Sequence, residues 1–182
     1  MVSTVPLSTS TETGKPRLWD WAFLAVLAIS LGAVVWVGQL AYHEGVKTER
    51  TKRLGEAWLE WLESAGAERG AGQGGVAACA RSPGLTWAAC QDWVTGPDGP
   101  LRAQVNPFDQ QPLRLAQKCD FSDRTLVGAL VLEKLMPTPP GSAVPHVIAP
   151  LGSGDAIDSA LTLRVTVCDK GAGPIKIGEV EF

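Results

Sequence analysis

The stretch YHEGVKTERTKRLGEAWLEWL, residues 42–62, decides the fold because it follows directly on a long segment without charge. If a helix formed by that segment ends at Tyr42, the segment is only an anchor or a signal peptide. If the helix continues, the chain is a membrane-rooted stalk that carries a small domain. After Tyr42, apolar residues recur at the spacings of one helical face, namely Val46, Leu54, Trp58, Trp61, Leu62 and Ala65.

Charge pairing and the placement of helix breakers also favour a continuous helix. Glu49 and Arg53 have opposite charges at i,i+4, a spacing that supports a helix by a few tenths of a kcal/mol. No proline occurs between Pro16 and Pro83, and the first strong stop is the glycine-rich run at 66–75. The helix is therefore predicted from about Leu18 to about Ala65.

The uncharged segment has the length and the flanks of a transmembrane helix. The 22 residues from Trp21 to Tyr42 carry no charge, and as a helix they would span roughly 33 Å, enough for a bilayer core of roughly 30 Å. A buried core helix seldom runs this long without charge, and a signal peptide has a shorter apolar run and a small-residue cleavage site. Residues 19–42 are therefore predicted to cross the membrane, with aromatic interface anchors at Trp19, Trp21, Trp36 and Tyr42.

The charge pattern and the cysteines disagree about the orientation in the membrane. More Lys and Arg follow the uncharged segment than precede it, which by the positive-inside rule would place the C-terminal side in the cytoplasm. All four cysteines lie on that same side, and an even number of cysteines in a small Gly/Pro-rich domain suits an oxidising compartment. We expect residues 1–18 in the cytoplasm and the C-terminal domain on the periplasmic or extracellular side of a bacterial inner membrane.

The amphipathic stalk predicted at 43–66 carries an apolar stripe that needs a cover. A free helix of this length is only marginally stable in water. The stripe could pack on the distal domain, on a second copy of itself or on the membrane surface, although Glu60, Glu63 and Glu68 disfavour the membrane surface. The residues of this predicted interaction stripe are Leu54, Trp58, Trp61 and Leu62.

Beyond the stalk, a glycine-rich hinge at 67–78 leads to a small domain at 79–182. The hinge is no phosphate loop, because no strand precedes it and no lysine follows. Residues 82–94 are predicted to form a short helix, and from Leu113 the apolar period changes to two. The strand candidates are 113–119, 125–135, 144–148, 161–169 and 175–182. The predicted class is α+β, with an antiparallel sheet whose apolar face is the natural partner of the helix stripe.

The four cysteines permit three disulfide pairings. We expect Cys79–Cys90, which closes a short loop around the small helix, and Cys119–Cys168, which ties the first strand to the fourth. Zinc is the rival interpretation, but the sequence has neither a C-x-x-C motif nor a histidine close to the cysteines.

Residues that could perform chemistry are few and scattered. His43 and His146 share no local motif with a nucleophile, and the acidic pairs Asp120/Asp123 and Asp155/Asp158 read as solvated turns or helix caps. With a net charge of −3 and no basic patch, nucleic acid is not expected as a partner. We expect a structural or assembly protein and not an enzyme, with no cofactor, no metal and no small-molecule substrate.

The order of the parts resembles that of type IV pilins and pseudopilins. In both, a short polar leader is followed by a membrane helix that runs on as an amphipathic helix and then by a small sheet domain that bears disulfides. The resemblance implies a filament or secretion subunit whose partners are the lipid bilayer and other protein subunits. In the family, a glycine cleavage site precedes Phe, apolar residues and a Glu at the fifth mature position. Here Gly14 is followed by KPRLWD, which departs at Pro16 and Asp20, so we expect no cleavage at Gly14.

Two other classes of function stay open. One is a single-pass accessory or assembly protein of a membrane complex, with an extracytoplasmic interaction domain. The other, an extracytoplasmic sensor or ligand-binding module, is less favoured, because the residues before the uncharged segment are too few for a cytoplasmic output domain.

Overall fold

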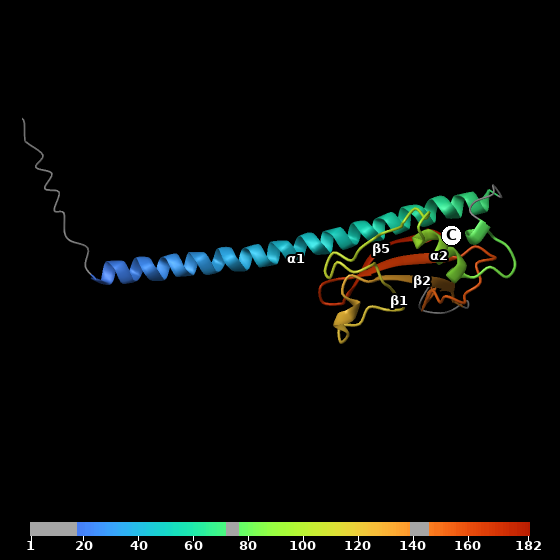
Figure 1. Ribbon diagram of the computed structural model, residues 1–182. Helices are drawn as coiled ribbons and strands as arrows, with labels where there is room; N and C mark the ends of the chain where they lie inside the picture. Colours follow the sequence, from blue (N-terminus) through green and yellow to red (C-terminus); the bar gives the residue numbers. More distant parts are fainter. Residues whose placement is uncertain (1–17, 72–76, 139–145) are drawn as a thin grey trace, which may run out of the picture. The chain divides into compact units, whose positions relative to one another are not determined.

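The computed structural model describes residues 18–71, 77–138 and 146–182 (Figure 1). Residues 1–17 of the predicted cytoplasmic segment 1–18, with Gly14 and Pro16, lie outside the described residues. The same holds for hinge residues 72–76 and for residues 144–145 of the third strand candidate. The chain divides into two compact units, residues 1–42 and residues 43–182.

Helix α1 extends from Leu18 to Gly70, so the helix does continue through Tyr42. In the first unit, the helical side chains that are described from Trp19 to Tyr42 are all exposed. An 18-residue window of this helix has a mean hydropathy of 2.2, and none of that window is buried. The helix is thus long and apolar enough to cross a membrane, and the crossing itself stays a prediction.

In the second unit, α1 buries one face from Thr51 to Arg69. The buried positions recur every three or four residues, as one face of an α-helix requires, and comprise Thr51, Gly55, Trp58, Leu62, Gly66 and Arg69. This face lies against the sheet, because a Cβ at Gly55 would be 2.7 Å from Ile177 Cγ1 and 2.9 Å from Val167 Cγ1.

Among the described residues, the sheet has five strands in the order β1-β2-β4-β5, with β3 also paired to β2. Their bounds are β1 Leu115–Ala116, β2 Leu130–Pro137, β3 His146–Pro150, β4 Thr162–Cys168 and β5 Pro174–Glu181. The α+β layout is confirmed, but the sheet is mixed rather than wholly antiparallel, because β1 runs parallel to β2. The thirteen residues 117–129 separate these two strands, which is long enough for the return crossing that parallel pairing needs.

Two strand candidates were too long at the ends where turns form. The candidate at 113–119 forms a strand only at Leu115–Ala116, and the candidate at 125–135 begins at Leu130. Arg124–Leu126 instead forms a 3-10 helix, η2, and Gly128 has a φ of +74°. Only glycine fits at Gly128, because a Cβ there would overlap the side chain of Asn106.

The apolar face of the sheet contributes to one core. Leu163, Val165 and Val167 of β4 alternate along the strand and join Leu130 and Leu132 of β2. The short helix α2, Trp87–Thr95, adds Trp87, Cys90 and Val94 to the same core. Helix α2 begins later than the predicted position 82, because Gly84 turns the chain with a φ of +84°. The 3-10 helix η1, Ala77–Cys79, precedes α2.

The predicted hinge begins too early. Helix α1 continues to Gly70, so Gly66 and residues 67–70 are helical. Gly66 is an interior contact position, because a Cβ there would overlap the carbonyl oxygen of Glu181 and lie 3.0 Å from the Cα of Phe182. The absent side chain lets the helix backbone approach the end of β5.

We expect Gly66→Ala to destabilise the domain by roughly 1–3 kcal/mol through overpacking, although Ala is the better helix former by about 1 kcal/mol. Gly45→Ala is the matched control, because nothing lies within 4 Å of a Cβ at Gly45. The control should unfold at the same temperature or slightly higher. Thermal unfolding of the detergent-solubilised protein, followed by near-UV circular dichroism, measures both variants. Equal melting temperatures for the two would contradict the contact at Gly66.

Candidate interaction surfaces

The predicted interface anchors all lie exposed on α1 in the first unit. Trp19, Trp21, Trp36 and Tyr42 have between 64% and 84% of their surface exposed. The apolar residues between them are exposed as well, and a contiguous apolar surface of this kind marks contact with lipid or with other protein. This is the first candidate interaction surface.

The predicted stripe belongs to the core of the second unit. Trp58 and Leu62 are fully buried, whereas Leu54 and Trp61 are partly buried. The indole Nε1 of Trp58 donates a hydrogen bond of 2.9 Å to Oε1 of Gln104, so the polar atom of this buried ring is satisfied. The covering partner of Trp58 and Leu62 is therefore the distal domain, which was one of the three alternatives.

A chain of aromatic rings extends from the stripe across the core. Trp61 lies edge-on to Trp58 at 6.1 Å between ring centroids and 5.9 Å from Phe182. Phe182 in turn meets Trp87 of α2 edge-on at 5.9 Å. Such pairs add about 0.5–1.5 kcal/mol each beyond the area that they bury. They join α1, the residue after β5, and α2 into one unit.

Arg69 completes this cluster at the end of the buried helix face. Its Nη2 donates a hydrogen bond to the carbonyl oxygen of Ile157, and its Cζ lies 3.9 Å from the centroid of the Phe182 ring. Burial, and then the positive charge of Arg81, lower the pKa of Arg69 to about 10. Nε and Nη1 have no hydrogen-bond partner among the described residues and are shielded from solvent. A dissolved anion could not reach these two atoms, so Arg69 serves packing.

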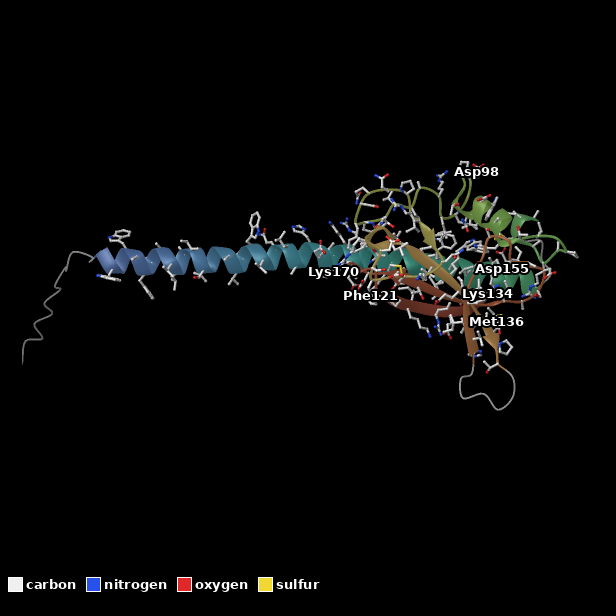
Figure 2. The ribbon with its side chains drawn as sticks, turned by 90° about the horizontal axis from the view of Figure 1, so that it is seen from below. Asp98, Phe121, Lys134, Met136, Asp155 and Lys170 are labelled. Atoms are coloured by element: carbon white, nitrogen blue, oxygen red, sulfur yellow. A yellow bond between two sulfur atoms is a disulfide. The ribbon has the colours of Figure 1, made fainter. Side chains whose placement is uncertain are left out.

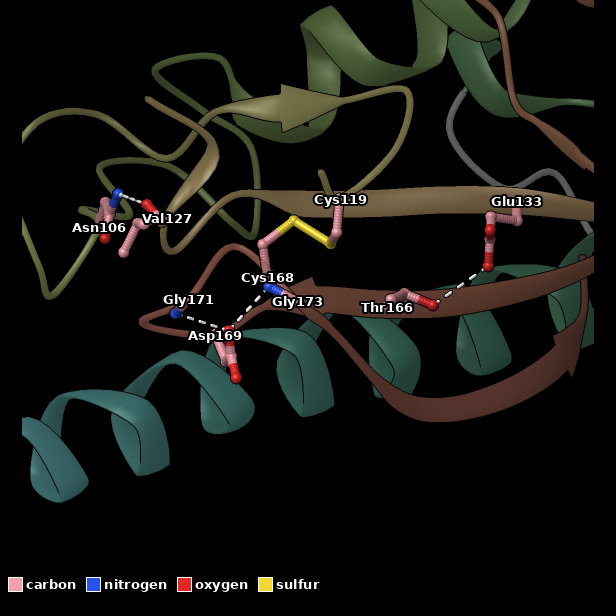
Figure 3. The surroundings of a disulfide bond; sticks show 9 residues. All are labelled: Asn106, Cys119, Val127, Glu133, Thr166, Cys168, Asp169, Gly171 and Gly173. Carbon is pink, nitrogen blue, oxygen red and sulfur yellow. Dashed lines mark hydrogen bonds between the residues drawn. A yellow bond between two sulfur atoms is a disulfide. The ribbon is translucent and has the colours of Figure 1, made fainter. Parts of the chain in front are cut away.

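Both disulfides have the predicted pairing. Cys79–Cys90 joins η1 to α2, with 4.6 Å between Cα atoms. Cys119–Cys168 ties the segment after β1 to the end of β4, with 5.4 Å between Cα atoms (Figure 3). Beside the second bridge, the Asp169 carboxylate accepts hydrogen bonds from the N–H groups of Gly171 and Gly173 at 2.7 and 2.8 Å. This fixes the turn between β4 and β5.

The remaining acidic candidates hold turns. The Asp120 carboxylate accepts hydrogen bonds from Lys118 and Ser122, which keep its pKa far below the usual range. Asp123 caps η2 by accepting from the backbone N–H of Thr125. Asp158 is exposed. These roles agree with the predicted turns and caps.

Asp155 is engaged in an ion pair that the sequence did not suggest. Its carboxylate lies 2.7 Å from Nζ of Lys134 and accepts a hydrogen bond from the N–H of Gly152 (Figure 2). Burial alone would raise the pKa of Asp155, but these two partners lower it below its usual value. The pair fastens the loop after β3 to β2.

No group of three or more His, Cys, Asp and Glu side chains is placed to hold a metal ion within residues 18–71, 77–138 and 146–182. His43 and His146 are both exposed and lie on different elements, α1 and β3. The absence of a metal, a cofactor and catalysis stays a prediction.

The second candidate surface, which the sequence reasoning missed, is the hairpin of β2 and β3. Met136, Val147 and Ile148 are each 42–47% exposed (Figure 2 labels Met136). A hollow of about 500 Å³ lies beside the hairpin, lined among others by Ile148, Pro150 and Leu126. The composition HVIAP of β3 was the available signal, because it contains no charged residue.

Comparison of the chain with protein families, with curated proteins and with solved structures finds no match. The residues of the chain itself therefore carry the functional inference.

We expect the Cys119–Cys168 bridge to stabilise the domain more than Cys79–Cys90 does. The first closes a loop of 49 residues and the second a loop of 11, for which loop entropy gives about 4 and about 3 kcal/mol. Two variants test this, one with Ala at positions 79 and 90 and one with Ala at positions 119 and 168. Urea unfolding measures the free energy of unfolding of each, with the reduced native protein as the reference. Thiol labelling of denatured, unreduced protein should find no free cysteine, and a reversed order of stability would contradict the loop argument.

Proposed function

We propose that the chain is a membrane-anchored structural subunit of an envelope-spanning or surface assembly, similar in architecture to a minor pilin or pseudopilin. Residues 19–42 would cross a bacterial inner membrane once, and residues 43–182 would lie on the periplasmic or extracellular side. The observation that carries the proposal is the division of α1. The helix exposes uncharged apolar side chains in the first unit and supplies the core of a folded domain in the second.

The extracytoplasmic placement rests on the disulfides. All four cysteines of the chain are paired, and such bonds persist in oxidising compartments and not in a bacterial cytoplasm. The domain is small, and two bridges supply stability that a core of this size does not easily provide alone. The proposal therefore prefers this orientation to the one that the flanking charges favour.

A non-catalytic role is part of the proposal. The histidines are far apart in the chain, and Asp120, Asp123 and Asp155 are occupied in a turn, a cap and an ion pair. Exposed apolar surfaces are the features left over, and surfaces of this kind suit contact with other macromolecules.

The alternative is a single-pass accessory protein of a membrane complex, and two observations favour it. Pro16 and Asp20 depart from the processing signature of pilins. Trp58 and Leu62 are fully buried within the domain, so they cannot form the seam of a helix bundle between subunits. The shape of the purified assembly, filament or discrete complex, distinguishes the two functions.

We expect the full chain to remain in membranes washed with alkaline carbonate and to expose its domain on the outer side. In spheroplasts, a membrane-impermeant maleimide should label Asp98→Cys, which lies at an exposed position of the domain, but should label Ser8→Cys only after permeabilisation. The reverse labelling pattern would overturn the proposed orientation, and release by carbonate would overturn the anchor.

Intact-mass measurement of the same protein addresses its processing. We expect no species that begins at Lys15, because Pro16 and the missing Phe disfavour pilin-type cleavage. A mature chain that begins at Lys15 would instead establish pilin-type processing and favour the filament function.

A further inference from the structure

The two outer strands β5 and β3 differ in the charge that they carry and in the regularity of their ladders. At one edge, β5 carries Lys176, Glu179 and Glu181, and the register of its ladder with β4 shifts between Val165 and Thr166. Charges and irregular registers of this kind prevent an edge from pairing with another chain. At the other edge, β3 has the sequence HVIAP without a charged residue and forms a regular ladder with β2.

The alternation of hydrogen bonds along the β2–β3 ladder shows which backbone groups of β3 point away from β2. The N–H of Leu151 donates to the carbonyl oxygen of Leu132 at 2.8 Å. In an antiparallel ladder the bonded residues alternate, so Ala149 and Val147 also direct their backbone groups toward β2. His146, Ile148 and Pro150 therefore direct theirs outward, where no described residue pairs with them.

The β2–β4 ladder independently gives the same assignment of backbone groups in β2 to its two neighbours. The N–H of Cys168 donates to the carbonyl oxygen of Ala129 at 2.8 Å, so the odd-numbered residues of β2 face β4 and the even-numbered ones face β3. Pro150 fits this assignment, because its missing N–H falls on the outward side and costs the β2–β3 ladder no hydrogen bond.

The outward edge of β3 is complementary to itself. If two copies of β3 run antiparallel about Ile148, each Ile148 exchanges both backbone hydrogen bonds with its counterpart. His146 of each chain then faces the partner's Pro150, and its N–H can donate to that carbonyl oxygen. Each outward N–H of the strand, from His146 and from Ile148, thus has an acceptor in the partner. Pro150, which has no N–H, stands opposite His146 of the partner subunit, whose N–H donates.

The side chains also suit a symmetric pair. Ile148, 46% exposed, would face Ile148 of the partner subunit on one side of the sheet. Val147 would face Ala149 of the partner subunit on the other side. No charged side chain lies on the strand, so pairing like with like meets no repulsion.

We propose that β3 is a self-association site at which it pairs antiparallel with β3 of a second copy, centred on Ile148. A contact between two strands of five residues is smaller than the roughly 1,200–2,000 Å² of a stable soluble interface. It therefore needs a high local concentration, which anchoring both copies in one membrane supplies. In this last respect the inference rests on the proposed function.

Cysteine cross-linking of the full chain in native membranes tests the register. Cα atoms in a hydrogen-bonded antiparallel pair are about 5.5 Å apart, within the range that a disulfide spans. Ile148→Cys should therefore form a disulfide-linked dimer on mild oxidation with copper phenanthroline. Before oxidation it should titrate with one free thiol per chain, which shows that the two native bridges are intact.

Val147→Cys is the matched control, because Val147 is 47% exposed and Ile148 is 46% exposed. Val147 would stand opposite Ala149 of the partner subunit, so two Val147 Cα atoms would lie about 8 Å apart, too far for a disulfide. We expect at least about a fivefold higher dimer yield for Ile148→Cys. Co-expressed Val147→Cys and Ala149→Cys chains should cross-link with each other.

Three results would overturn the pairing. They are equal yields for Ile148→Cys and Val147→Cys, no dimer for Ile148→Cys, and a cross-link to a different protein in place of the dimer.

Ile148→Pro gives a second readout, because it removes an outward N–H and leaves the β2–β3 ladder intact. It should abolish chemical cross-linking between native-cysteine chains without lowering the melting temperature. Chains that fail to pair but stay in carbonate-washed membranes would refute this inference alone and leave the proposed anchorage standing.

Discussion

Helix α1 and the sheet approach each other closely because glycine replaces a side chain at both ends of their contact. Gly55 faces Ile177 and Val167, and Gly66 faces the backbone of Glu181 and Phe182. The two glycines are eleven residues apart, which is close to three helical turns, so they lie on one face with Trp58 and Leu62 between them. Fully burying each of these two side chains contributes about 1.5–3 kcal/mol. The sheet face and α2 share the same core, so the domain depends on the helix that enters it.

The two parts of α1 meet opposite requirements with one backbone conformation. Up to Tyr42 the helix is apolar on every side and finds no cover within its own unit, whereas from Thr51 onward only one face is apolar and the domain covers it. An all-round apolar helix needs lipid or other helices. The change of pattern at Tyr42–His43 coincides with the boundary between the two units, and under the proposed function it is also the change from lipid to water.

Periodicity, charge spacing and cysteine spacing were enough to predict the long helix, the α+β class and both disulfides. They failed where the lack of a side chain matters or where the contacting residue is distant in the sequence. Gly66 was interpreted as the start of a hinge because glycine is a poor helix former, but here it removes a steric barrier against Glu181. Arg69 was placed in the hinge because it lies among the same glycines. It stacks on Phe182, which is 113 positions away in the sequence, and no local pattern reveals such a contact. The parallel pairing of β1 was missed because alternation specifies a strand but not its direction.

The internal use of the helix stripe limits what the domain can offer to partners. Trp58 and Leu62 have no exposed surface, and the buried donors of Arg69 are closed to solvent, so the most apolar part of the second unit is unavailable for assembly. Among the described residues of that unit, the β2–β3 hairpin combines exposed apolar side chains with outward backbone groups that have no partner in the sheet. Natural sheets guard such an edge with charge, as β5 does with Lys176 and Glu179. An edge without charge is tolerable in a chain whose copies meet in a fixed orientation, and the proposed membrane anchor would restrict the encounters that lead to uncontrolled stacking. The absence of charge on β3 thus fits the anchored architecture that the apolar half of α1 suggests.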